Sequence, residues 1–475
     1  MTDQLKPKIA GGLKWLFASQ VVNQGLFIWF SIYLARMLDP SMFGVVGLVT
    51  VITNYAVLFV DLGFGAALVQ RKDLDQEHLS SVFWFNVLIG LMLGATIFFL
   101  GPLIAQFYDE PVLVDVARVL SVNFLLSSFS LVQSNLLDKE MKFKRKVTIN
   151  WVATFTGYVV GISLAWSGYG LWSLVYQLLV TQLATTILLW FFSSWSPGLQ
   201  FSMSKLRELL PFGLNVVGET SVNYWSRNAD NFLIGKFVGI EGLGLYSRAY
   251  SMMLIPVRNI SSVVSRVMFP AFSSIQNDHE TIRMYYLKAI RYIAMITFPA
   301  MAGLTLVAKE FVLVCFGDKW IDMIPLVQWL AILGAVQSIL NLNGSIYYAV
   351  GKPHIAFRVT LVTSVILLVG FVVGLLVNGL LGLTIAYFIA GTLLAVPVYR
   401  IAIRQIGLSL GQVFQSLSGP FWSSVLMSAS IVAFQYLVPV SDMVVALIAS
   451  IVIGMAVYFI LLYVMDKEFK ALIKR

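Results

Sequence analysis

The sequence has little charge and a large excess of apolar residues. Only 12% of its 475 residues are charged and 59% are hydrophobic, which gives a mean hydropathy of +0.85. Soluble proteins have about 25% charged and about 45–50% apolar residues. A water-soluble core of this size cannot hide so many apolar side chains. The composition therefore excludes an ordinary soluble protein and indicates an integral membrane protein.

The scarcity of cysteine and histidine excludes several kinds of site. A single cysteine, Cys315, excludes an intramolecular disulfide bond. The three histidines, His78, His279 and His354, are expected in polar connections and lack the spacing of metal ligands. Neither of the two Gly-Lys pairs has the glycine and hydroxyl residues of a P-loop, which excludes an ATPase of that type. We therefore expect no metal and no cofactor.

Long polar connections are also missing. The longest, at about 271–287, is far too short for a soluble domain, and the connections on the opposite side are shorter still. An enzyme that assembles glycans would need acids, histidines or arginines displayed on a substantial loop. We therefore expect a chain that is not an enzyme.

What the sequence does contain is a series of apolar runs. A bilayer core is about 30 Å thick and needs about 20 residues per helix. On this basis the sequence predicts an all-α integral membrane protein with fourteen transmembrane helices, at about 13–37, 42–62, 79–101, 112–136, 147–166, 170–192, 209–234, 243–270, 288–308, 324–350, 355–377, 379–400, 417–438 and 442–465.

The distribution of basic residues predicts the orientation of these helices. Of the 32 lysines and arginines, 23 fall on one side of the expected membrane, four on the other and five within expected helices. Cytoplasmic connections of multi-span proteins carry the excess of basic residues. We therefore expect both termini in the cytoplasm, and the net charge of +9 needs no nucleic-acid partner.

A weak internal repeat appears at an offset of 200 residues. Asn23 aligns with Asn223, Gly44 aligns with Gly244, and the residues around Arg36 align with those around Lys236. The repeat predicts two pseudo-symmetric six-helix lobes, 1–192 and 209–405, joined by a cytoplasmic linker at 193–208. Residues 406–475 would add two further helices and a cytoplasmic tail. In transporters built from such duplicated bundles, the substrate site lies between the halves.

Polar residues recur along the expected helix at 209–234. Every third or fourth position is polar, at Asn215, Glu219, Asn223, Ser226 and Asp230, with Arg227 beside them. Ionisable groups at bilayer depth cost about 2.5–3.5 kcal/mol and usually face a cavity or a partner. The stripe is either the wall of a polar cavity or a structural network in which Arg227 pairs with Asp230. The expected first helix repeats the pattern around Asn23.

Three arginines lie in the expected helix at 243–270. Arg248 and Arg266 are 18 residues apart, so a straight α-helix places them on one face, about 27 Å apart. Arg258, beside Pro256 near mid-helix, lies about 80° from that face. Arg248 and Arg266 can extend to the two membrane surfaces, but Arg258 is too deep, which makes it the strongest candidate for binding an anion. Arginine suits phosphate and carboxylate through paired hydrogen bonds.

Four further charged groups complete the candidate site. Arg118 would add to a positive cavity if its helix lines one. Asp61, Glu219 and Asp230 are the candidate carriers of a coupling proton or sodium ion, although Asp61 lies near a helix end where it can be interfacial. An anionic lipid with a polar head group is the substrate that these residues favour.

Four segments together resemble a known family of transporters. They are Asp61–Lys72 (DLGFGAALVQRK), Asn223–Gly235 (NYWSRNADNFLIG), Phe269–Asp278 (FPAFSSIQND) and Phe316–Trp320 (FGDKW). In combination they resemble the polysaccharide-transporter branch of the MOP exporter superfamily, and within it the Wzx flippases of the colanic-acid type. The resemblance extends over nearly the whole chain and is densest between residues 10 and 360.

The resemblance implies a bacterial inner-membrane flippase that works as a monomer. Its substrate would be undecaprenyl-pyrophosphate-linked oligosaccharide repeat units for exopolysaccharide or lipopolysaccharide synthesis, moved by alternating access and driven by an H+ or Na+ gradient. Membrane lipids and the polysaccharide polymerase machinery would be its partners. Two alternatives stay open: another MOP exporter, for peptidoglycan precursors or drugs, and a membrane-embedded glycan assembly enzyme. An exporter of cationic drugs should have acidic rather than basic cavity residues.

Overall fold

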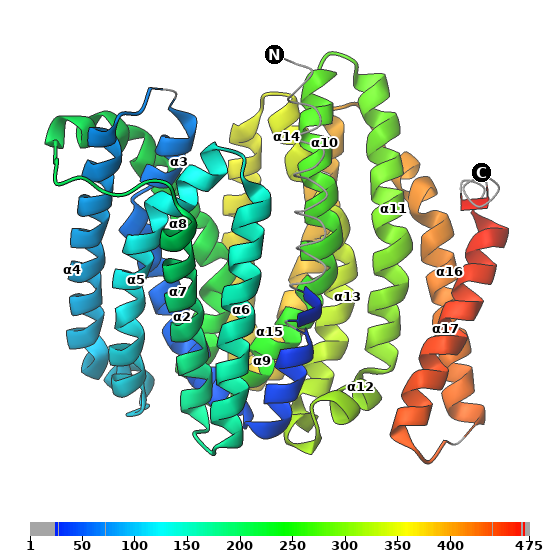
Figure 1. Cartoon of the computed structure of the whole chain (residues 1–475). Helices are drawn as coiled ribbons and strands as arrows, with labels where there is room; N and C mark the ends of the chain where they lie inside the picture. Colours follow the sequence, from blue (N-terminus) through cyan, green and yellow to red (C-terminus); the bar gives the residue numbers. More distant parts are fainter. Residues whose placement is uncertain (1–23, 27, 72, 439, 467–468, 471–475) are drawn as a thin grey trace. The chain divides into compact units, whose positions relative to one another are not determined.

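The computed structural model describes residues 24–26, 28–71, 73–438, 440–466 and 469–470 (Figure 1). Within these residues the secondary structure is helical and contains no β-strand. The chain divides into two compact units, Met1–Gly244 and Leu245–Arg475. The predicted all-α membrane fold is confirmed.

In the first unit, long helices pack in antiparallel pairs. α4 lies along α5, α6 lies along α7, and α2 packs against α5 and α8. A buried cluster around Phe64, Phe83 and Leu209 joins α3, α4 and α8. The helices of this unit are α2 (Pro40–Asp61), α3 (Phe64–Gln70), α4 (Gln76–Tyr108), α5 (Leu113–Lys139), α6 (Phe143–Trp166), α7 (Leu171–Phe192) and α8 (Met203–Phe237).

The second unit is built around α11. This helix packs against α13 and α16, and α16 packs against α17. One of its buried clusters includes Phe272, Tyr286 and Ile290. α9 begins at the end of the first unit and continues into the second. The helices are α9 (Ile240–Pro256), η1 (Val257–Ser261), α10 (Ser262–Ser274), α11 (His279–Leu306), α12 (Ala308–Cys315), η2 (Asp318–Met323), α13 (Ile324–Leu340), α14 (Asn343–Ala349), α15 (Pro353–Arg404), α16 (Leu410–Leu437) and α17 (Met443–Met465).

Local sequence signals set several helix starts. The side chain of Asp75 accepts a hydrogen bond from the backbone N–H of His78 at the start of α4. Asp278 and Asp442 cap α11 and α17 in the same way, and Ser409 begins α16 with a capping box. Such caps satisfy backbone N–H groups that have no partner within the helix. They fix where each of these helices begins, in the polar segments between the apolar runs.

Eleven of the described helices are long and apolar enough to cross a membrane. One of them, α15, has 52 residues and contains a kink at Asn378 and Gly379, whose backbone angles are not helical. A straight helix of that length would span about 78 Å, so the kink separates two membrane-length halves, as expected for 355–377 and 379–400. α8 is more polar and is not among the eleven. The expected helix at 13–37 is helical at 24–26 and 28–37, and its other residues lie outside the described ones. The number fourteen stays a prediction.

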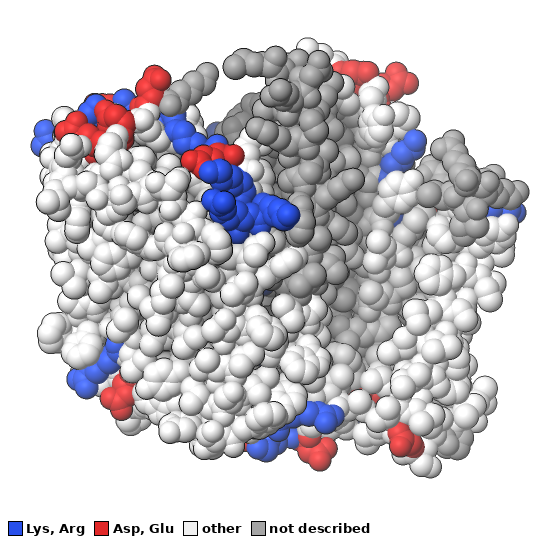
Figure 2. Space-filling view, viewed as in Figure 1, with Lys and Arg blue, Asp and Glu red and all other residues white. Residues whose placement is uncertain are grey.

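Charged side chains gather near the helix ends. Figure 2 shows lysine, arginine and acidic residues in two zones with a broad uncharged band between them. This distribution is the one that a bilayer requires, because its hydrocarbon core excludes unpaired charges. The chain is therefore a multi-pass membrane protein.

The segment expected to link the lobes packs within the first unit. Residues 193–202 form a loop, and α8 begins at Met203. The indole of Trp84 donates to the carbonyl oxygen of Gly198 over 2.8 Å, and the N–H of Ser202 donates to Ser81 Oγ over 2.8 Å. These contacts fix the loop against the start of α4. The division into lobes at 1–192 and 209–405 stays a prediction.

Candidate functional site

One face of α8 carries an exposed polar stripe. Asn215, Glu219, Asn223 and Arg227 recur every four residues, and all four are exposed. Positions four apart lie above one another on a helix, so these side chains form a single row. Because they are exposed, they do not tie α8 to the other helices of the first unit. This disfavours a structural network for these four residues, and the cavity wall stays a prediction.

A neighbouring side of α8 is fixed to the first unit. The phenol of Tyr224 donates a 2.6 Å hydrogen bond to the carbonyl oxygen of Val51 in α2. Gly213 lies against the turn at Leu62 and Gly63, where a side chain would overlap the backbone. Both contacts orient α8 and leave its polar stripe uncovered by this unit.

Arg227 and Asp230 lie in different surroundings despite their proximity in the sequence. Arg227 is exposed, whereas Asp230 is only 3% exposed. The carboxylate of Asp230 accepts a 2.8 Å hydrogen bond from the N–H of Asn231. Of the predicted coupling residues on α8, Glu219 is therefore accessible and Asp230 is enclosed.

Arg258 lies on a break in the helical hydrogen-bonding pattern of the second unit. It is the second residue of η1, a five-residue π-helical turn that follows Pro256. The N–H of Ser262 bonds to the carbonyl oxygen of Val257, and Ser262 Oγ donates to the same oxygen over 2.9 Å. Arg258 itself is exposed. Single π turns within α-helices are frequent at functional sites.

The π turn corrects the prediction that Arg248 and Arg266 share a helix face. That prediction assumes a continuous α-helix, but a π turn contains one additional residue. One residue corresponds to about 100° of rotation, so Arg266 is turned by about that angle from the expected face. Arg248 is half-buried, and Arg266 is exposed with its Nε donating to Ser262 O over 3.3 Å.

Two other candidate residues have local structural contacts. The guanidinium of Arg118 in α5 lies 5.3 Å from the ring centre of Phe98 in α4, a cation–π contact on the exposed side of this pair. Asp61 ends α2, and its Oδ1 accepts a 2.9 Å hydrogen bond from Gly65 N at the start of α3. Asn23 lies outside the described residues.

A polar network at the start of α4 was not found from the sequence. His78, expected in a polar connection, is only 2% exposed. Its Nδ1 lies 2.7 Å from Asp75 Oδ1, and its Nε2 lies 3.6 Å from Glu208 Oε2. Arg71 also pairs with Glu208, and Lys205 donates to Asp75 over 3.1 Å. The only sequence signal was the Asp-x-x-His spacing at a helix start.

This network alters the acidity of both carboxyl groups. The backbone N–H and the ring of His78 hold the pKa of Asp75 well below its usual value. A hydrogen bond from Arg71 lowers the pKa of Glu208. Hydrogen bonds to the charged form favour ionisation. Across the part of the chain that the structure describes, no group of three or more histidine, cysteine or acidic side chains is placed to hold a metal ion.

The sequence matches a family model described as polysaccharide biosynthesis protein, over residues 33–325. The chain belongs to this family. The lipopolysaccharide biosynthesis protein WzxC of Escherichia coli K12 is 28% identical over 423 residues, which cover 88% of this chain and 86% of WzxC. The predicted membership of the polysaccharide-transporter branch is confirmed.

Solved structures show which fold the helices adopt. The structure of a lipid II flippase, MurJ, in an inward closed conformation matches with a TM-score of 0.77. The match covers 96% of this chain and 98% of the MurJ chain, at 15% identity. An inward-facing multidrug transporter of the MATE family, in the MOP superfamily, has a TM-score of 0.65 and covers 80% and 94%, at 18% identity. At these identities the likeness shows the fold alone, and this chain shares that fold with both transporters. Because the two transporters differ in substrate, the fold alone does not select one.

Proposed function

We propose that this chain flips undecaprenyl-pyrophosphate-linked oligosaccharide units across the membrane for polysaccharide synthesis. The family supplies the polysaccharide context, and the fold is shared with a lipid II flippase. The observation that carries the proposal is Arg258, an exposed arginine on a π turn inside a membrane-length helical segment. A cation at that depth needs an anionic partner.

The chemistry of the substrate suits both the arginines around η1 and the polar stripe of α8. The guanidinium of Arg258 would bind the pyrophosphate through paired hydrogen bonds, and Arg248 and Arg266 would offer cations at other levels of the same helix. The amides of Asn215 and Asn223 on α8 would bind sugar hydroxyls, because an amide offers both donors and acceptors. The lipid tail would stay in the bilayer. A cationic drug fits these arginines poorly, which disfavours multidrug export.

The energy source and the cellular setting form part of the proposal. Glu219, Asp230 and Asp61 are the carboxylates that would carry a coupling proton or sodium ion during alternating access. The chain would act as a monomer in the bacterial inner membrane, with both termini in the cytoplasm. It would deliver its cargo to the polysaccharide polymerase. The excess of basic residues on one side of the predicted helices supports this orientation.

The test is to measure lipid-linked intermediates in cells. Cells that lack the protein should accumulate undecaprenyl-pyrophosphate repeat units and lose surface polymer, as measured by extraction and mass spectrometry. Complementation with Arg258→Ala should leave the accumulation in place. Arg258→Lys should restore export only partly, because lysine keeps the charge but not the paired hydrogen bonds.

Arg404→Ala is the matched control. Arg404 is an exposed arginine at the end of α15, so its replacement removes the same charge outside the proposed path. It should restore normal export. Normal intermediates and normal polymer in cells without the protein would contradict the flippase function and favour drug export. Equal activity of Arg258→Ala and the control would remove Arg258 from the path.

A further inference from the structure

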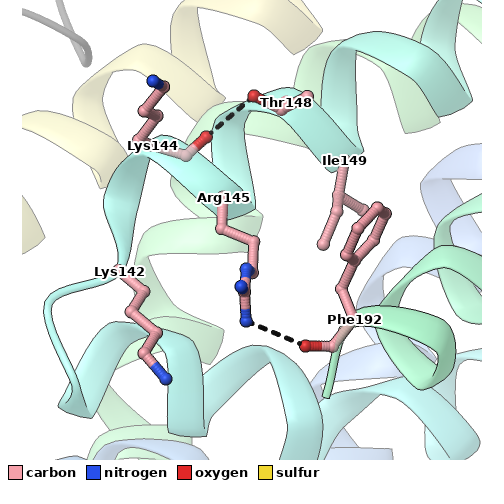
Figure 3. Close-up of a pocket in the computed structure, with 6 residues that line it drawn as sticks. All are labelled: Lys142, Lys144, Arg145, Thr148, Ile149 and Phe192. Carbon is pink, nitrogen blue, oxygen red and sulfur yellow. Dashed lines mark hydrogen bonds between the residues drawn. The ribbon is translucent and has the colours of Figure 1, made fainter. Parts of the chain in front are cut away.

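A basic cavity lies at one end of the helix pair α6 and α7. Its volume is about 400 Å³, and its lining residues are Lys142, Lys144, Arg145, Thr148, Ile149 and Phe192 (Figure 3). Lys142 immediately precedes α6, and Phe192 is the last residue of α7. Because both helices are membrane spans, the cavity opens at a membrane surface. None of its lining residues belongs to α8 or is one of the arginines that the proposed flippase mechanism uses.

The cations of this cavity are held in different ways. Arg145 Nη1 donates a 3.1 Å hydrogen bond to the carbonyl oxygen of Phe192, and its Cζ lies 5.9 Å from the centre of that ring. Lys142 pairs with Glu140, both being about two-fifths exposed. Figure 3 shows Lys142 and Lys144 pointing in opposite directions, with Arg145 reaching toward Phe192. Within the described residues, Arg145 has no carboxylate partner.

The walls of the cavity are those of a lipid-contacting site. Ile149 and Phe192 supply apolar surface directly beside the cations. The preceding residues, Trp190 and Phe191, are 39% and 79% exposed. Aromatic residues are enriched at membrane interfaces, so this end of α7 marks the level of the lipid head groups. A ligand here would meet cations at its head and apolar side chains below.

A buried amide lies behind the basic cavity. A second, small pocket of about 10 Å³ shares Lys142, Arg145 and Phe192 with the cavity and is also lined by Gln133 and Glu140. The Gln133 side chain is 1% exposed, and neither of its amide atoms has a hydrogen-bond partner among the described residues. Buried polar atoms without partners are rare in proteins. The amide therefore offers a donor in the small pocket next to the cations.

We infer that this cavity binds the phosphate group of an anionic lipid in the adjacent membrane leaflet. Arg145 and Lys142 contact the phosphate, Lys144 adds positive charge at the rim, and Ile149 and Phe192 contact the upper part of an acyl or prenyl chain. Basic pockets between membrane helices bind lipid head groups in this way. The inference does not require the chain to be a flippase.

The experiment measures lipid binding by the purified full-length protein with native mass spectrometry. Phosphatidylglycerol, phosphatidylcholine, undecaprenyl diphosphate and inorganic phosphate are tested in parallel. Phosphatidylglycerol should bind, and the double variant Lys142→Gln/Arg145→Gln should weaken it roughly tenfold or more, given the contribution of each surface cation. Thr148→Trp keeps every charge but fills the cavity, so it should weaken binding as well. The melting temperatures of all variants establish that they are folded.

The matched control is Arg400→Gln/Arg404→Gln, which removes two exposed arginines from α15 and should leave binding unchanged. If undecaprenyl diphosphate also binds and is weakened by the same substitutions, the site accepts lipid phosphates from both sources. Three results would overturn the inference: equal binding by the cavity and control variants, equal binding of phosphatidylcholine, or binding of inorganic phosphate without any lipid. A folded protein that binds lipid but fails in the export assay would reject only the proposed function.

Discussion

Gly44 in α2 and Gly244 in α9 form a reciprocal close contact within the first unit. A side chain at Gly44 would overlap the carbonyl oxygen of Ile240, and one at Gly244 would overlap the carbonyl oxygen of Pro40. Each glycine therefore faces the residue four positions before the other. Gly44 and Gly244 are 200 residues apart, and so are Pro40 and Ile240; this is the offset of the internal repeat. Repeat-related residues thus form a self-complementary contact, as in an isologous interface.

We expect Gly44→Ala and Gly244→Ala each to reduce the amount of folded protein. The added methyl group would meet backbone atoms, which cannot move as freely as a side chain. Gly47→Ala on the same helix is the control, because its methyl group would lie 3.4 Å from the flexible side chain of Leu243. Size-exclusion chromatography in detergent and thermal unfolding measure the effect. Equal amounts of folded protein and equal melting temperatures for the three variants would show that α2 and α9 can move apart at these glycines without loss of stability.

Arg291 and Asp466 form an enclosed ion pair in the second unit. Arg291 Nε lies 3.4 Å from Asp466 Oδ2, the Asp466 side chain is fully buried, and Arg291 also donates to Ser416 O over 2.9 Å. Removing one member of a buried pair leaves an uncompensated charge and costs about 3–5 kcal/mol. We expect Arg291→Ala to lower the free energy of unfolding by about that amount.

The double variant tests whether this loss comes from the pair. Arg291→Ala with Asp466→Ala should be less destabilised than the sum of the single variants, because neither charge is then left buried alone. Equilibrium unfolding in detergent gives the three free energies. Additive losses would mean that the two side chains act independently.

The cap at Asp75 should make stability depend on pH in the acid range. Hydrogen bonds from His78 lower the pKa of Asp75 from 3.8 in the folded state. The stabilisation is therefore complete above pH 3.8 and is lost as the pH falls through the lower folded pKa. We expect Asp75→Asn to lower the melting temperature by a few degrees at neutral pH and the difference to shrink in acid.

Asp73→Asn is the control for this measurement. Asp73 lies two residues earlier, is exposed and caps no helix, so its replacement should change the melting temperature little at any pH. Melting curves between about pH 3 and pH 7 cover the onset of this loss, because the carboxyl group of the unfolded chain is titrated near pH 3.8. A constant difference between wild type and Asp75→Asn over that range would contradict the role of the carboxylate charge.

The polar stripe of α8 should be accessible to water. In a Cys315→Ala background, cysteines at Glu219 and Asn223 should react with a hydrophilic maleimide. A cysteine at Leu376, which is 78% exposed on the apolar helix α15, should react only with a lipid-soluble reagent. A cavity wall predicts this difference because maleimides react with the hydrated thiolate. If positions 219 and 223 behave like 376, the stripe faces lipid.

The sequence predicted those features that repeat along the chain. Apolar runs located the membrane helices, and the four-residue spacing of polar side chains on α8 predicted a row that the structure leaves exposed. Hydrophobic periodicity is a local property, so it can be read from neighbouring residues.

Features that depend on distant contacts were not predictable in this way. His78 is buried, and its Nε2 lies 3.6 Å from Oε2 of Glu208, which is 130 positions away in the sequence. The π turn at Arg258 was also missed, although Pro256 marks a break. A proline removes one hydrogen bond but does not specify which bonds replace it. The exact faces of Arg248 and Arg266 therefore depended on the fold and not on their spacing.

The π turn also determines how this helix tolerates changes in length. Between α9 and α10, the turn at Val257–Ser261 contains one residue more than a regular turn needs. Deleting one residue there would restore a continuous α-helix and leave the side chains on both flanks in register. The same deletion within α9 or α10 would rotate everything beyond it by about 100°. The segment around Arg258 is thus the place in this helix where evolution can delete a single residue without disturbing the packing on either side.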